Sequence, residues 1–191
     1  MVGQKICSHF HSFRITTSDM RQLILFRHAK TEPYSETGSD ETRQLTDRGH
    51  LDAQAISVQL KALGIEPTRA LVSTARRTRQ TVAEFKRVYT DIQVQFYEQL
   101  YLADPEEIIN CIQTAEDTET LVVIGHNPGL HELALQLTEY GGFSNSFAAS
   151  QLRVKFPTAA MAIFDAKEEA PFDIYNFQLS EFFTPKSLAE A

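Results

Sequence analysis

The chain has 191 residues, of which 42% are hydrophobic and 23% charged, and its formal net charge is −7. This composition is typical of a globular domain with a full core and excludes an intrinsically disordered chain. The acidic balance argues against a general nucleic-acid binder, and no apolar run approaches the roughly 20 residues that span a bilayer. Any strongly basic site is therefore expected to be a local pocket.

The first 19 residues, MVGQKICSHFHSFRITTSD, lack the long apolar core and the small-residue cleavage site of a secretory signal. We expect residues 1–19 to be a poorly ordered leader without a chemical role, and residues 20–191 to form a single cytoplasmic domain. His9 and His11 lie two apart and could touch a metal, but in such a segment adventitious binding is the simpler interpretation.

Residues 22–27, QLILFR, contain an apolar run with the length of a buried strand. A polar, loop-like stretch follows. Thr46 is then expected to cap a helix that ends at Gly64, because threonine favours the N-cap and glycine the C-terminal stop. The buried face of this helix is predicted to hold Ile56, Leu60 and Leu63.

A second short strand, ALVS at 70–73, precedes a helix from about Arg76. The buried stripe of this helix is predicted to hold Val82, Phe85 and Tyr89. Another strand follows the helix. The sequence DPEE at 104–107 then predicts the start of a further helix, because it combines an aspartate cap with proline at the first helical position.

LVVIGH at 121–126 is a third apolar strand, and NPGL after it opens a helix with Asn127 as the expected cap and Pro128 at the first position. Apolar alternation or apolar runs then predict strands, some of them antiparallel. These are LRVKF (152–156), AAMAIFD (159–165) and FDIYNFQL (172–179). The pattern predicts a three-layer α/β/α sandwich around a mixed, mostly parallel central sheet.

Charged residues follow the first three apolar strands at their carboxyl ends. Arg27 and His28 end the first, Arg76 and Arg77 follow the second, and His126 ends the third. In open α/β sheets ligands bind outside the carboxyl ends of the strands, so we expect these side chains to converge. Guanidinium groups bind phosphate oxygens and imidazole can act as a nucleophile, so the cluster predicts a phosphate site.

Each of these segments has a plainer interpretation when taken alone. An Arg-His pair at a strand end is more often surface chemistry, RRTR is more often a solvated helix face, and GHNPG could be only a capped turn. Their joint placement at three strand ends favours the functional interpretation.

Five segments together carry a family resemblance: LFRHAKT, RQLTDRG, LVSTARRTRQT, VIGHNPGL and FTPKSL. In this order the chain resembles the histidine phosphatase superfamily, which has the phosphoglycerate-mutase-like fold. Within it, the chain is most similar to the small bacterial phosphohistidine phosphatases. The resemblance covers about residues 20 to 185.

The resemblance implies roles for the charged residues. His28 would be the nucleophile that is transiently phosphorylated, and Arg27 would hold the phosphoryl oxygens. Ser73 fixes the register of the motif, which makes Arg77, rather than Arg76, the second phosphate arginine. His126 would donate to the phosphoryl group and stabilise its charge in the transition state.

Three further positions are implied more weakly. Arg43 matches an arginine at the mouth of the pocket, and Thr31 falls where related enzymes carry a hydroxyl near the phosphate. Glu98 is the nearest candidate for the proton donor that ester phosphatases use. Ala29 replaces the usual glycine of Arg-His-Gly, which is tolerable where the backbone needs no positive φ.

No metal or other cofactor is expected. Cys7 and Cys111 form no motif, which argues against a zinc site or a disulfide framework. In phosphoryl transfer the catalyst mainly positions the reacting groups and neutralises the charge on the phosphoryl oxygens. Arginines can do this in place of magnesium.

The leading hypothesis is a phosphatase that works through a phosphohistidine intermediate on His28 and acts on phosphohistidine in a protein. A short chain without capping insertions predicts an open pocket that admits a protruding phosphohistidine. One alternative is a phosphatase or mutase for a small phosphorylated metabolite, dependent on Glu98. Another is a non-catalytic module that binds phospho groups. Neither nucleic acid nor membrane is an expected partner.

Overall fold

The structure is a computed structural model that describes residues 20–115, 118–168 and 170–190. The expected leader, with Cys7, His9 and His11, lies outside the described residues. Within the described ranges, no helix is both long and apolar enough to cross a membrane.

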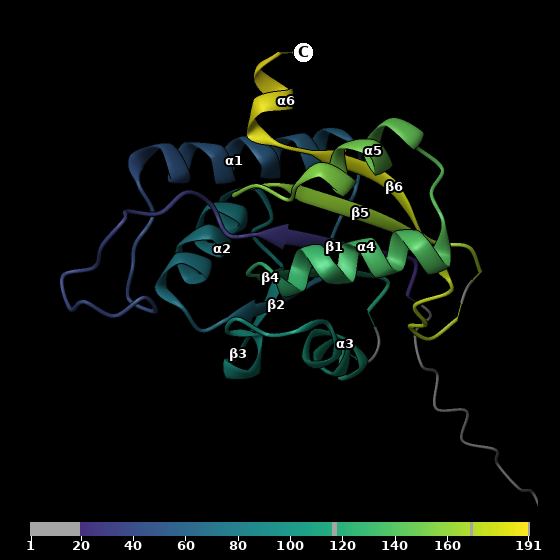
Figure 1. Cartoon of the computed structure of the whole chain (residues 1–191), viewed down its shortest axis with the longest axis horizontal. Helices are drawn as coiled ribbons and strands as arrows, with labels where there is room; N and C mark the ends of the chain where they lie inside the picture. The colour runs from purple at the N-terminus through teal and green to yellow at the C-terminus, as the bar shows by residue number, and fades with distance from the viewer. Residues whose placement is uncertain (1–19, 116–117, 169, 191) are drawn as a thin grey trace, which may run out of the picture.

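A mixed sheet forms the centre of the described chain (Figure 1). Its six strands are β1 (Gln22–Arg27), β2 (Arg69–Ser73), β3 (Gln93–Tyr97), β4 (Thr120–Gly125), β5 (Met161–Ala166) and β6 (Phe177–Phe183). They lie in the order β3-β2-β4-β1-β5-β6. The first four strands of this order are parallel, whereas β5 is antiparallel to β1 and β6 is antiparallel to β5. The predicted mixed, mostly parallel sheet is thus confirmed.

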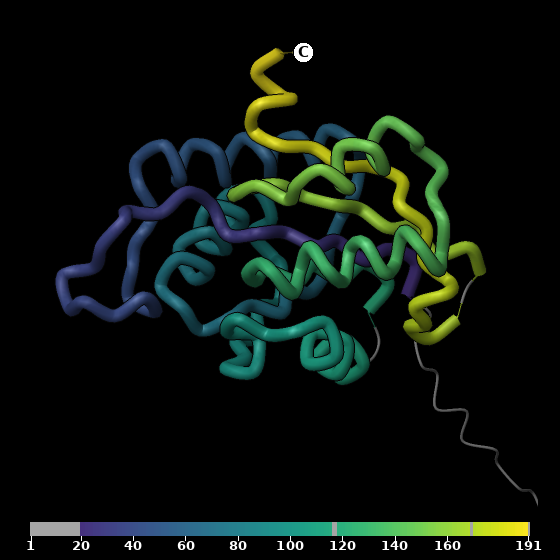
Figure 2. Tube along the Cα trace, in the orientation of Figure 1, coloured from purple at the N-terminus to yellow at the C-terminus, as the bar shows by residue number. Residues whose placement is uncertain are grey.

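Helices cover both faces of the sheet (Figures 1 and 2). They are α1 (Asp47–Ala62), α2 (Arg76–Val88), the short 3₁₀ helix η1 (Glu98–Leu100), α3 (Pro105–Gln113), α4 (Gly129–Gly141), α5 (Ser146–Val154) and α6 (Pro185–Ala189). Leu23 and Leu25 of β1 pack with residues of α3, α4 and α5. Ile24 and Phe26 point to the other face and pack with residues of α1 and α2. This alternation confirms the three-layer sandwich.

Local sequence signals account for most helix ends. The Thr46 side chain accepts a hydrogen bond from the backbone N–H of Gly49 and so caps α1. Gly64 follows the end of α1 with a φ of +75°, in the left-handed region that glycine tolerates best. Leu63 was expected in the buried stripe, but it is 44% exposed, because α1 ends at Ala62.

Residues 152–156 were predicted as a strand, and this is wrong. Residues 152–154 form the end of α5, which Asn145 caps by accepting from the N–H of Ala148. The apparent alternation arises because Leu152 and Phe156 are buried while Val154 is 77% exposed. The predicted strand at 159–165 is present as β5, whereas only the last three residues of the segment 172–179 belong to β6.

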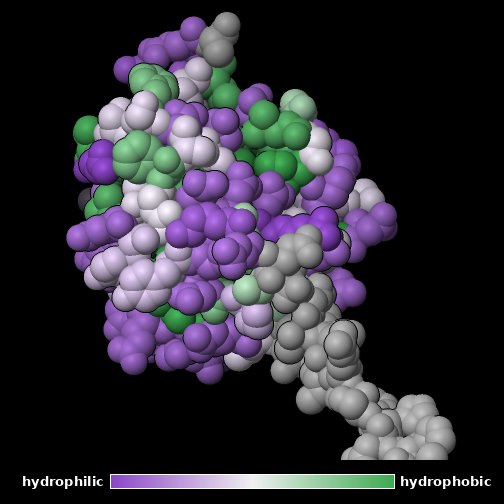
Figure 3. Space-filling model, turned by 90° about the vertical axis from the view of Figure 1, so that its right-hand side faces the viewer, coloured by the Kyte–Doolittle hydropathy of each residue, from purple (hydrophilic) through white to green (hydrophobic). Residues whose placement is uncertain are grey.

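One edge of the sheet collects the segments that matter for function. The parallel strands β1, β4 and β2 end there, and Met161 at the start of β5 pairs with Phe26 near the end of β1. Met161 also pairs with Phe183, so β6 ends at the same edge. We call this the site edge. Figure 3 views the opposite side of the fold, where the surface is mostly hydrophilic with separated hydrophobic patches.

Candidate active site

Two histidines and an arginine come together at the site edge. His28 follows β1, His126 follows β4, and Arg77 lies in the first turn of α2. The centroids of the two imidazole rings are 5.2 Å apart. All three residues are buried, with 8%, 2% and 3% of their surfaces exposed for His28, His126 and Arg77.

His28 is held in one tautomer. Its Nδ1 lies 2.8 Å from the carbonyl oxygen of Ala29, which can only accept, so Nδ1 carries the proton and Nε2 keeps its lone pair. Burial lowers the pKa of His28 to about 3, and the charges of Arg77, Arg27 and Arg43 act in the same direction, while the Ala29 hydrogen bond opposes them. His28 is therefore neutral at pH 7, as an imidazole nucleophile must be.

His126 has the opposite arrangement of its ring nitrogens. Arg77 Nε donates to Nδ1 at 3.2 Å, so the proton is on Nε2, which lies 2.8 Å from Ser73 Oγ. Burial lowers the pKa of His126 to about 2, with further lowering by the Arg77 charge. Ser73 is fully buried at the end of β2, and the sequence analysis gave it only the role of fixing the motif register.

Arg27 has an unused donor at this site. Its Nη1 donates to the carbonyl of Phe156 at 2.8 Å, but its buried Nε has no hydrogen-bond partner within the described ranges. Asn127 Nδ2 donates to the same carbonyl at 2.9 Å, and Asn127 Oδ1 is also buried and unpartnered there. Asn127 was predicted to cap α4, and this is wrong. Pro128 occupies the N-cap position, because α4 begins one residue later than expected, at Gly129. Buried polar groups without a partner are rare in folded proteins, and two of them lie together at this site.

The loop between Thr31 and Leu45 brings Arg43 to the site. Arg43 Nε donates to the carbonyl of Glu32 at 2.9 Å, Nη1 donates to Asp40 at 2.9 Å, and Nη2 donates to the Thr31 hydroxyl. Thr31 thus lies beside Arg43, and an isolated bridge between Thr31 and Leu45 closes the base of the loop.

Asp40 is a site residue that the sequence analysis missed. Arg77 donates from Nη1 to the backbone carbonyl of Asp40 at 2.7 Å and from Nη2 to its carboxylate at 3.0 Å. Tyr101 donates its hydroxyl proton to the same carboxylate at 2.9 Å. The only signal in the sequence was an acidic residue three positions before Arg43 in a polar loop.

Glu98 and Tyr101 lie close together in the chain but differ in their contacts. Glu98 is exposed at the start of η1, and its side chain makes no hydrogen bond or ion pair with any other described residue. Its role as proton donor stays a prediction. The Tyr101 ring lies 5.5 Å from that of His126 and 5.7 Å from the Arg77 guanidinium carbon.

The chemistry of this cluster is that of an oxyanion site. Three guanidinium groups surround two neutral imidazoles, and one of these has a free nitrogen lone pair. Across the described part of the chain, no group of three or more His, Cys, Asp or Glu residues is placed to hold a metal ion. The arrangement supplies a nucleophile and several fixed donors for a phosphoryl group.

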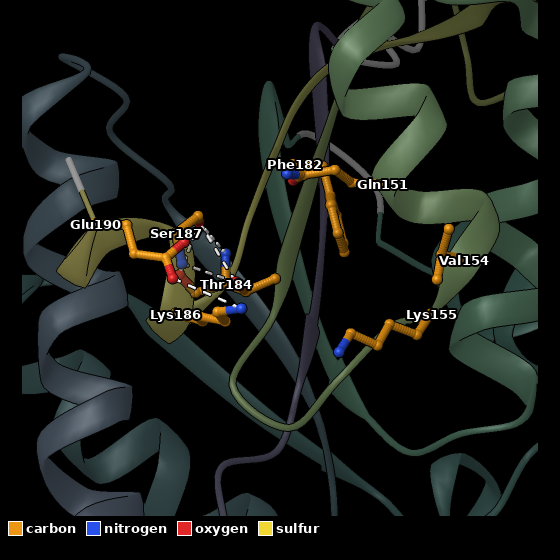
Figure 4. Close-up of a pocket in the computed structure, with 8 residues that line it drawn as sticks. All are labelled: Gln151, Val154, Lys155, Phe182, Thr184, Lys186, Ser187 and Glu190. Carbon is orange, nitrogen blue, oxygen red and sulfur yellow. Dashed lines mark hydrogen bonds and ion pairs between the residues drawn. The ribbon is translucent and has the colours of Figure 1, made fainter.

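A separate groove lies between α5 and α6, also at the site edge (Figure 4). In Figure 4 the side chains of Lys155 and Lys186 extend from its two walls. None of the histidines or arginines described above lines this groove, so it is distinct from the candidate catalytic centre. Its lining residues are Gln151, Val154, Lys155, Phe182, Thr184, Lys186, Ser187 and Glu190.

Comparisons with known proteins by sequence bear on the family of the chain. The family model for the histidine phosphatase superfamily (branch 1) matches residues 23–101. An uncharacterised protein of Mycobacterium tuberculosis, Rv1276c, is 33% identical over 138 residues, which cover 72% of this chain and 84% of the relative.

Solved structures show the same fold. The predicted phosphohistidine phosphatase SixA of Agrobacterium tumefaciens is 25% identical with a TM-score of 0.73, covering 88% of this chain and 100% of that one. Its counterpart from Nakamurella multipartitia is 26% identical with a TM-score of 0.75, covering 86% and 96%. Sequence and structure together assign the chain to its family: it belongs to the histidine phosphatase superfamily.

Proposed function

We propose that this phosphatase hydrolyses phosphohistidine on a protein through a phosphorylated intermediate on His28. The observation that carries the proposal is the tautomer of His28, whose Nδ1 proton is bound by Ala29 and whose Nε2 lone pair is free among arginines. Arg27 and Arg77 bind the phosphoryl oxygens, with Arg43 at the mouth. His126 stabilises the charge of the transferring group by donating its Nε2–H to a phosphoryl oxygen in place of Ser73 Oγ.

The proposed reaction has two displacements. The Nε2 lone pair of His28 attacks phosphorus, and the bond from phosphorus to the substrate nitrogen breaks. When the other ring nitrogen of the substrate carries a proton, the leaving imidazole departs neutral. Water then attacks the phosphorus on His28, the electron pair of the P–N bond returns to Nε2, and inorganic phosphate leaves while the proton of water passes to solvent.

Among the described residues, neither Asp40 nor Glu98 is held at the site as a protonated acid, and this supports a nitrogen leaving group. Burial alone would raise the pKa of Asp40, but hydrogen bonds from Arg43, Tyr101 and Arg77 lower it to about 2, so Asp40 is ionised at neutral pH. Glu98 is exposed and without a side-chain partner in the described chain. An alkyl phosphate needs a proton donor for its oxygen, whereas the nitrogen of phosphohistidine can leave without one.

A protein substrate is supported by a basic surface beside the site. A groove next to that of Figure 4 is lined by four cationic side chains and one acidic side chain, Asp52, although the chain as a whole carries −7. Lys155 and Lys186 line both grooves. This surface suits an acidic protein docked along the site edge. The four cations are Lys30, Arg48, Lys155 and Lys186.

The proposal is tested by comparing kcat/KM for a phosphohistidine protein, phosphoimidazole and 3-phosphoglycerate. We expect Lys155→Glu to lower kcat/KM for the protein about tenfold and to leave phosphoimidazole unchanged. Lys86→Glu is the matched control, because Lys86 lies in the last turn of α2, away from the site edge. Faster turnover of 3-phosphoglycerate than of either phosphoramidate would instead favour a phosphatase for small metabolites.

A further inference from the structure

Asp40 places a carboxylate at the mouth of a site built for an anion. Its two carboxylate oxygens accept hydrogen bonds from Arg43, Arg77 and Tyr101, at 2.9, 3.0 and 2.9 Å. The Arg77 side chain is only 3% exposed, whereas that of Asp40 is 47% exposed. The carboxylate is therefore much more accessible to solvent than the Arg77 guanidinium that it binds.

The net charge around the two histidines indicates how many negative charges a bound substrate can carry. The charged groups that shift the pKa of His28 or His126 are Arg27, Arg43, Arg77 and Asp40. Three guanidinium groups and one carboxylate give +2, since both imidazoles are neutral. A phosphoryl dianion balances this charge, whereas a substrate with one more anionic group exceeds it.

Resting on the proposed function, we propose that Asp40 is a specificity-determining residue. Its carboxylate disfavours substrates that carry a second anionic group beside the phosphate, and it favours a neutral or cationic leaving group such as the imidazole of phosphohistidine. The carboxylate oxygen bound to Arg43 accepts one hydrogen bond from the described residues, so it retains capacity to accept an N–H from the leaving group.

Two other roles for Asp40 make different predictions. If Asp40 only orients Arg77 and Arg43, its loss lowers the turnover of every substrate alike. If it only obstructs the anion site, its loss raises every rate alike. A selective role changes the ratio between substrates, because only the group beside the phosphate differs.

The test is Asp40→Asn, which keeps the shape and the acceptor oxygen but removes the charge. Phenyl phosphate, 4-carboxyphenyl phosphate and phosphoimidazole are compared by kcat/KM in the variant and in the natural protein. We expect Asp40→Asn to raise the ratio of carboxyphenyl to phenyl phosphate about tenfold, the effect of one unit charge several ångströms away in a partly solvated site. The ratio of phosphoimidazole to phenyl phosphate is expected to fall.

Asp91→Asn is the control for the change in net charge, because Asp91 is exposed just before β3, whose start lies away from the site edge. Equal changes for all three substrates in Asp40→Asn would overturn the inference. Binding of phenylphosphonate and 4-carboxyphenylphosphonate gives the same ratio without turnover. If the natural protein fails to hydrolyse phosphoimidazole, the proposed function fails, while the ratio for the two phosphonates still decides the role of Asp40.

Discussion

Arg77 donates a hydrogen bond from Nε to Nδ1 of His126 at 3.2 Å, and this bond fixes the tautomer of the second histidine. Because Nδ1 accepts, the remaining ring proton lies on Nε2 and points to Ser73 Oγ. In His28 the proton lies instead on Nδ1 and points to Ala29. The two neighbouring imidazoles are therefore both neutral and differ in which ring nitrogen carries the proton.

Ser73→Ala should impair catalysis through His126. The substitution leaves a buried Nε2–H without its acceptor, which costs about 1–3 kcal/mol of the free energy of unfolding and loosens the ring. We expect kcat to fall about tenfold with a smaller change in KM. Ser57→Ala is the control, since Ser57 is equally buried but donates only within α1, to Ala53. A natural kcat in Ser73→Ala would refute a positioning role for Ser73.

Arg77→Lys should lower kcat/KM by at least about a hundredfold, because a lysine cannot reproduce the planar set of donors. Its neighbour Arg76 is exposed, so Arg76→Lys should leave kcat/KM within about twofold of the natural value. The pair of variants decides which arginine of the motif binds phosphate. Equal losses in the two variants would contradict the assignment to Arg77.

The two buried histidines should make stability depend on pH. The pKa values of His28 and His126 are about 3 and 2 in the folded chain, against about 6.5 for free histidine. Between these values the unfolded chain binds more protons, so the free energy of unfolding should fall as the pH drops below about 6.5. Each histidine contributes at most about 1.4 kcal/mol per pH unit, and above pH 6.5 this contribution is complete.

Urea denaturation between pH 4.5 and 7.5 checks this dependence. His28→Asn should show a shallower slope than the natural chain, because one of the two groups no longer titrates. The low pKa of Asp40 affects stability only below about pH 4, outside this range. Identical slopes for the two proteins would show that His28 is not held neutral by the fold.

Most of the fold could be predicted because it depends on local patterns. The apolar runs of β1, β2 and β4 and the caps at Thr46 and Asp104 are signals within a few residues. The strand predicted at 152–156 failed because five alternating residues also fit a helix end, and only packing decides between them. Register within the sheet likewise depends on contacts far apart in the chain.

The candidate site was predictable where residues follow strand ends, as His28, Arg77 and His126 do. Asp40 and Ser73 were missed for different reasons. Asp40 lies in an irregular loop, and its contacts are to residues 3, 37 and 61 positions away. Ser73 was seen as part of a motif, but its partner His126 is 53 residues distant. Such pairings have no periodic signature.

Gly49→Ala should destabilise the fold and disturb the segment after His28. A Cβ at Gly49 would lie 2.1 Å from the backbone oxygen of Lys30, so α1 or residues 28–31 must move. We expect a loss of about 2 kcal/mol or more in the free energy of unfolding, together with reduced kcat. Gln54→Ala, at an exposed position of α1, should change stability by less than about 0.5 kcal/mol. Unchanged stability of Gly49→Ala would contradict this close approach.

The most direct test of the account is to trap the phosphorylated protein. The chain is mixed with a phosphohistidine protein labelled on the phosphoryl group, quenched in alkali within one turnover, and mapped by mass spectrometry. The account predicts an alkali-stable, acid-labile phosphoryl group on His28 that is lost in His28→Ala while the folded structure is retained. Label on another residue, or hydrolysis by His28→Ala at the natural rate, would contradict it.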